Sequence, residues 1–229
     1  MTHFNPDFID FFVELERNNN KAWFDENRKR YESSVKEPFA KFVDQLISAI
    51  QKYDPSIQIS AKEAILRINR DIRFSKDKRP YNPYYTAFIS PTGRKDKTIP
   101  GFFLRFAPDM IGVMVGCFGP SKEQLHNIRV SVINQQEEFD QIINDENFVK
   151  QFGSIKGDIS KRLPVQFKRP SEQYPLIANK AFYFSKHMDA DLITSENLHS
   201  ILMELWHVAK PLNQFLYSAI TRPLLEVEV

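Results

Sequence analysis

Six cationic side chains stand close together in the run ILRINRDIRFSKDKRP at residues 65–80. Asp71 and Asp77 are the acids of this run, so six cations less two carboxylates leave it with a charge of +4. A guanidinium group offers planar pairs of donors that match phosphate and carboxylate. The residue types therefore predict a site for an anion.

Alternation of apolar and polar residues from position 66 to position 74 predicts a β-strand. Arg67, Asn69, Asp71 and Arg73 would share its polar face, with neighbours about 6.6 Å apart. Such a row can hold an anion, and Asp71 beside the arginines is the best candidate acid or base. In the alternative interpretation, the arginines pair with Asp71 and with other acids of the chain in a ladder of salt bridges.

Two neighbouring segments are predicted to complete the site. One is the loop of small and charged residues that follows the strand, which can act as an anion-binding nest or be a solvated turn. The other is a helix start with free N–H groups, where Trp23 stacks on a ligand ring or packs in the core. The ligand residues predicted in these segments are Ser75, Lys76, Asp77, Asn19, Lys21 and Trp23.

Arg70 falls on the apolar face of the predicted strand. An unpaired charge there would cost several kcal/mol on an order-of-magnitude scale, so we expect Arg70 to have a partner in a structural ion pair. A bulge near Asp71 would exchange the two faces and add Arg70 to the ligand site.

The sequence lacks the motifs of several well-known binding and catalytic sites. The chain has no GxxxxGK[ST] or GxGxxG phosphate loop, its histidines form no HExxH motif, and Ser75 lies in no GxSxG elbow. The lone Cys117 sits in an apolar run and excludes an intramolecular disulfide. We therefore predict no metal site and no nucleotide site of these kinds, and the sequence leaves the cofactor unknown.

The elements predicted around the site form an α+β fold of one domain over residues 1–229. Helical periodicity covers the N-terminal, central and C-terminal parts, beginning with a core-facing helix at Phe8, Phe11, Phe12 and Leu15. The segments YYTAFIS, GFFLRFA and MIGVMVGCF predict further strands of an antiparallel meander of four to six strands, with AFYFSKHM as an edge strand. Residues 153–175 are predicted to be irregular.

Two segments, NNNKAWFDENRKRY at 18–31 and RINRDIRFSKDKRPY at 67–81, resemble the bacterial domain-of-unknown-function 2461 family. The resemblance extends over the whole chain through PGFFLRFAPDMIGVMVGCFGPSKEQLHNIR and KRLPVQFKRPSEQYPLIANKAFYF. It implies an α+β fold and a bacterial setting, and it supplies no activity, substrate or cofactor. No apolar run reaches the roughly 18 residues of a transmembrane helix, so we expect a cytoplasmic protein without a membrane partner.

Three hypotheses of function follow. The favoured one is a site for a small phosphate- or carboxylate-bearing ligand, which leaves open whether the protein is an enzyme. The second is a non-catalytic module for protein or nucleic acid, in which Tyr81, Tyr84 and Tyr85 are exposed contacts, although a net charge of +2 argues against strong nucleic-acid binding. In the third, the motif only stabilises the fold. The oligomeric state is not indicated.

Overall fold

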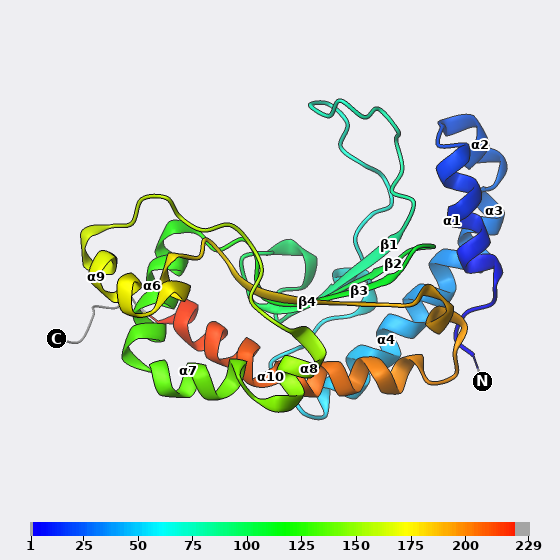
Figure 1. Ribbon diagram of the computed structural model, residues 1–229. Coiled ribbons are helices and arrows are strands. Elements are labelled where there is room, and N and C mark those ends of the chain that lie inside the picture. Colours follow the sequence, from blue (N-terminus) through cyan, green and yellow to red (C-terminus); the bar gives the residue numbers. More distant parts are fainter. Residues whose placement is uncertain (1, 223–229) are drawn as a thin grey trace. The chain divides into compact units, whose positions relative to one another are not determined.

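The computed structural model describes residues 2–222 of the chain. Its four strands form one antiparallel sheet in the order β1-β2-β3-β4, and helices make up most of the rest, so the fold is α+β as predicted (Figure 1). The strands are β1 (Tyr85–Ile89), β2 (Gly101–Phe106), β3 (Ile111–Cys117) and β4 (Phe182–Met188). The predicted meander is confirmed, and β4 takes the edge position expected for AFYFSKHM.

The described residues group into two compact units. Of these residues, unit 1 takes 2–95, 103–113 and 187–204, and unit 2 takes 96–102, 114–186 and 205–222. The single domain predicted from the sequence stays a prediction. No helix among residues 2–222 is both long and apolar enough to cross a membrane.

Unit 1 is built around the aromatic face of its first helix. Phe8, Phe11, Phe12 and Leu15 of α1 are fully buried, as their spacing predicts. The ring of Phe8 packs on Phe39 and Phe106. The helices of this unit are α1 (Asp7–Arg17), α2 (Lys21–Glu26), α3 (Arg28–Arg30), η1 (Tyr31–Lys36), α4 (Glu37–Gln51), α5 (Ala61–Ala64), η2 (Gly93–Lys95) and η4 (Ala190–Thr194).

Unit 2 holds the helices α6 (Lys122–Asn134), α7 (Gln136–Ile143), α8 (Glu146–Phe152), α9 (Val165–Gln173) and η3 (Pro175–Ala178). Ser121 and Gln124 form the capping box that opens α6. The last helix, α10 (Leu198–Thr221), has residues in both units. The prediction that residues 153–175 are irregular is wrong for α9, where Pro164 stands at the N-cap and Pro170 lies inside the helix without ending it.

Arg30 ties two helices of unit 1 together. Its guanidinium donates to Asp7 through Nε (2.9 Å) and Nη2 (2.6 Å), and to Glu14 through Nη1 (2.9 Å) and Nη2 (3.0 Å). We expect Arg30→Ala to lower the free energy of unfolding by about 1–2 kcal/mol, because charged hydrogen bonds are strong and these are half-buried. Urea denaturation monitored by circular dichroism measures the change.

Arg28→Ala is the matched control, since Arg28 makes one exposed pair with Asp25 on the same stretch of chain. Its expected effect is much smaller than that of Arg30→Ala, because solvent screens an exposed pair. Equal effects of the two substitutions would contradict the role assigned to Arg30.

Candidate functional site

Residues 65–81, here called the basic loop, do not form the predicted strand. Figure 1 shows them as an irregular cyan to teal segment that leads into β1. Isolated antiparallel bridges join Ile65 to Ala87 and Asn69 to Tyr81, and the Arg70 N–H donates to the Pro80 carbonyl at 2.8 Å. The two arms of the loop thus pair through their backbones at the base. Residues 71–79, here called the tip, lie beyond this backbone pairing.

Two aspartates explain why no strand forms over residues 66–74. The Asp71 carboxylate accepts from the backbone N–H of Arg73 (3.3 Å), and the Asp77 carboxylate accepts from the backbone N–H of Arg79 (3.0 Å). These bonds to the residue two positions on bend the backbone and compete with a sheet ladder. The row of four polar side chains on one strand face is therefore wrong beyond Asn69.

The acids of the loop are used within the loop. Asp77 accepts from Arg70 (2.8 Å) and from Arg79 (2.9 Å), and Asp71 accepts from Arg73 (2.7 Å). The partner predicted for Arg70 is therefore found, but it lies in the loop tip. Lys78 Nζ donates to the Ile72 carbonyl at 3.0 Å and closes the tip. These contacts hold the tip together internally.

The base of the basic loop contacts the segment at residues 18–31 through Tyr81. The Asn19 amide donates to the Tyr81 carbonyl (2.9 Å) and accepts from the Tyr81 N–H (3.0 Å). The Tyr81 ring stacks on Phe24 at 4.0 Å between centroids. The structure thus brings two predicted ligand residues, Asn19 and Asn69, to opposite sides of Tyr81. The side-chain amide of Asn19 is hydrogen-bonded to the Tyr81 backbone.

The other predicted residues of the helix start have local partners. Lys21 pairs with Asp25, and the Trp23 ring lies 5.5 Å from that of Phe11. Asn20 is the helix cap, because its side chain accepts from the Trp23 N–H at 3.0 Å. In the tip, the Ser75 N–H donates to the Ile72 carbonyl, so it is not available to a nest. Ligand roles for these residues stay predictions.

Phe74 is the residue of the loop that the sequence pattern misplaces most. The alternation over residues 66–74 places Phe74 on the apolar strand face with Ile68, yet its side chain is 95% exposed while Ile68 is buried. The Arg73 guanidinium lies 5.8 Å from the centroid of its ring. The signal available in the sequence is the position of Phe74 between the two aspartates that bend the chain.

Two cations of the basic loop have no partner in the described part of the chain. Arg67 and Lys76 are exposed, and neither takes part in an ion pair or hydrogen bond there. Together with Phe74 they form the exposed, uncommitted surface of the loop. A cationic surface with an exposed ring can bind phosphate groups and stack on a planar group.

The comparison with family descriptions matches residues 7–215 to one described as a conserved hypothetical protein (DUF2461). The chain belongs to this family. The match contains both motifs that carry the resemblance and so confirms it. Neither the comparison with curated proteins nor that with solved structures gives a match.

In this DUF2461 member two of the tyrosines expected as exposed contacts are buried. Tyr81 is enclosed by Phe24 and Asn19, and the Tyr85 hydroxyl accepts from that of Tyr31 at 3.0 Å. Burial raises the pKa of both Tyr31 and Tyr85. The prediction that Tyr81 and Tyr85 are exposed contacts is therefore wrong, because their rings belong to the core of unit 1.

Asp71, the candidate acid or base, lies in surroundings that favour its charged form. The side-chain hydrogen bonds from Arg73 hold the pKa of Asp71 below its usual value, and the guanidinium of Arg79 does the same for the pKa of Asp77. A general base at neutral pH needs a raised carboxyl pKa. The arrangement thus suits fixed charge rather than proton transfer.

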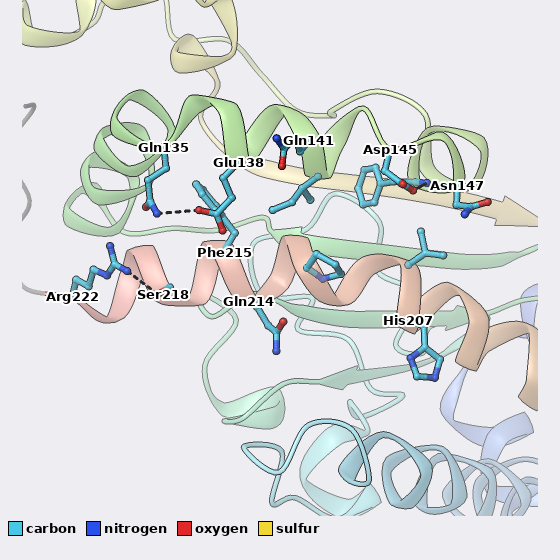
Figure 2. A pocket seen from close by; sticks show the side chains of 14 residues that line it. Gln135, Glu138, Gln141, Asp145, Asn147, His207, Gln214, Phe215, Ser218 and Arg222 are labelled. Atoms are coloured by element: carbon cyan, nitrogen blue, oxygen red, sulfur yellow. Dashed lines mark hydrogen bonds between the residues drawn. The ribbon is translucent and has the colours of Figure 1, made fainter.

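A separate pocket of about 760 Å³ lies in unit 2, between α7, the start of α8 and α10 (Figure 2). Figure 2 shows the Gln135 amide donating to Glu138 on its rim, at 3.1 Å. Half-buried Ile142 and buried Phe215 supply apolar surface. None of the ligand residues predicted from the sequence lines this pocket. Among residues 2–222, no group of three or more metal-ligating side chains is placed to hold a metal ion.

Proposed function

We propose that this protein binds single-stranded nucleic acid without catalysis, through the exposed side chains of the basic loop. The observation that carries the proposal is Phe74, a ring 95% exposed within a segment of charge +4. Bases of single strands stack on aromatic rings, and their phosphates bind lysine and arginine. A loop that presents both groups suits this class of ligand.

The charges of the loop support a polyanion. Asp71 and Asp77 are held by arginines of the same loop. The loop has a charge of +4, and all of its cations except Arg70 are exposed. Arg67 and Lys76 need break no bond to reach a phosphate group. Arg73 is already placed beside the Phe74 ring, where a guanidinium strengthens stacking.

The exposed ring favours a polymer over the small anion that the sequence predicted. Phosphate or carboxylate alone would gain little from Phe74, whereas a base in a single strand gains about 1–3 kcal/mol from stacking. An anionic membrane surface also combines cations with apolar contacts, but one phenylalanine buries too little area to anchor a protein of this size. The small-anion ligand at Arg67 and Asn69 stays a prediction.

Fluorescence anisotropy with a short labelled oligothymidine tests the proposal. We expect a dissociation constant on the order of 10⁻⁴–10⁻⁶ M, because near-neutral net charge limits affinity. With about three to four phosphate contacts, the slope of log affinity against log salt should be about −2 to −3. Affinity would then fall about 20- to 50-fold between 50 and 200 mM salt.

The double substitution Arg67→Ala with Lys76→Ala should make this slope less negative by about 1.4, which is about 0.7 for each lost phosphate contact. Lys41→Ala with Lys62→Ala removes the same charge from exposed sites of unit 1 and should leave the slope unchanged. The proposal fails if the oligonucleotide does not bind at low salt. It also fails if vesicles with anionic lipids bind while the oligonucleotide does not.

A further inference from the structure

Arg129, in α6 of unit 2, is a buried cation without an anionic partner. Arg129 is only 5% exposed. Its Nη2 donates to the Ser160 hydroxyl and to the Asn179 carbonyl, both at 3.0 Å. Its Nε–H is buried and has no hydrogen-bond partner. In the described part of the chain, Arg129 takes part in no ion pair.

Burial of this charge is costly. A buried guanidinium is normally paired with a carboxylate, and an unpaired ion costs several kcal/mol on an order-of-magnitude scale. Two neutral oxygens and the ring of Phe167, 5.5 Å from the guanidinium carbon, compensate it in part. Burial lowers the pKa of Arg129 accordingly. A bound oxyanion would supply the missing negative charge and an acceptor for Nε.

The segment that supplies the neighbours of Arg129 is poor in acids and rich in cations. Residues 156–180 include Ser160, Phe167 and Asn179 and carry six cations against two carboxylates, a charge of +4. One of these acids, Asp158, already lies 3.6 Å from Lys180. Within residues 156–180, the exposed cations that form no ion pair with another described residue are Lys156, Lys161, Arg162, Lys168 and Arg169. This segment attracts anions toward Arg129.

The segment that covers Arg129 is lightly held beyond Ser160. The Ser160 N–H donates to the Ala178 carbonyl at 2.7 Å. The next described backbone N–H along the chain that donates to a backbone carbonyl is that of Phe167, which bonds to Pro164. Apolar residues on both sides are turned to solvent, with Ile159 64% exposed and Val165 80% exposed. Residues 161–164 therefore bury little surface that an entering ligand would have to expose.

We propose that Arg129 is the buried end of an oxyanion site in unit 2. The site takes a small phosphate- or carboxylate-bearing ligand on the Arg129 Nε–H and the Ser160 hydroxyl. Because Ser160 Oγ already accepts from Arg129, its own hydrogen is available to the ligand. This site shares no residue with the basic loop and does not depend on the function proposed for that loop.

Titration of the full chain with inorganic phosphate tests the site, with sodium chloride at equal ionic strength as the reference. In a ¹⁵N–¹H spectrum of arginine Nε groups, the Arg129 signal, assigned by its loss in Arg129→Lys, should shift and saturate. At ten times the dissociation constant, phosphate should raise the melting temperature by about 3–6 °C. Acetate in place of phosphate shows whether a carboxylate serves as well.

Arg129→Met removes the charge and keeps an apolar stem, so the rise of the melting temperature with phosphate should disappear. Arg162→Met, an exposed cation of the same segment, should keep most of it. If Arg129→Met does not fold, Ser160→Ala with the spectrum of the unchanged arginine gives the same answer through a weaker phosphate affinity. An Arg129 signal that responds neither to phosphate nor to acetate overturns the proposal, as does equal stabilisation of Arg129→Met.

Discussion

Phe74→Ala is expected to weaken binding of a short oligothymidine about 5- to 150-fold, which corresponds to the loss of about 1–3 kcal/mol of stacking. The slope of affinity against salt should not change, because the ring carries no charge. Its side chain is almost fully exposed and makes no core contact, so the free energy of unfolding should stay within about 0.5 kcal/mol. Anisotropy titrations and urea denaturation on the same variant separate the two effects.

Ile159→Ala is the matched control for Phe74→Ala, since it also removes an exposed apolar side chain, but outside the basic loop. It should leave oligonucleotide affinity unchanged. A Phe74→Ala variant that binds as tightly as the natural chain would mean that the ring takes no part in binding. A change in salt slope would mean instead that the substitution rearranges the neighbouring arginines.

Gly116→Ala should give the largest loss of stability, about 3 kcal/mol or more. Gly116 in β3 has a φ of +98°, and an added Cβ would lie 2.3 Å from the Phe182 carbonyl oxygen of β4. Both strands would have to shift, since the obstacle is backbone rather than a flexible side chain. The Gly116 N–H also donates to Asn213 of α10 at 2.8 Å, and that bond would be disturbed.

Gly153→Ala separates the two causes. Gly153 also has positive φ (+65°), but an added Cβ would meet no atom within 4 Å. It should cost less than Gly116→Ala, because only the strain of a positive-φ backbone is added there and no atom is in the way. Comparable losses in the two variants, measured by urea denaturation, would contradict the close approach of β3 and β4 at Gly116.

The periodic parts of the chain are the parts that could be predicted. The face of α1 and the capping box of α6 follow from spacings that reflect helix geometry. The strand expected at 66–74 failed because Asp71 and Asp77 bond to the backbone two residues on, a local preference that outweighs alternation. Without this strand, no sheet in the described part of the chain covers Phe74, and its side chain is exposed.

The two proposed sites differ in how far the sequence indicates them. The charge of the basic loop can be counted in the sequence, whereas the pairing of Arg70 with Asp77 across the tip cannot. Arg129 gave no signal at all, because a charged residue within a helical pattern is expected on its solvated face. Its burial depends on Ser160, Phe167 and Asn179, which lie 31 to 50 residues away along the chain.

The measurement that tests the central claim most directly is the fluorescence of a Phe74→Trp variant during titration with oligothymidine. Stacking on a base should quench the tryptophan at 74, saturably and less strongly at higher salt, after subtraction of the signal from Trp23 and Trp206 in the natural chain. Such quenching would place a base against residue 74. Emission that stays unchanged while the oligonucleotide is bound would show that the tip of the basic loop is not the binding surface.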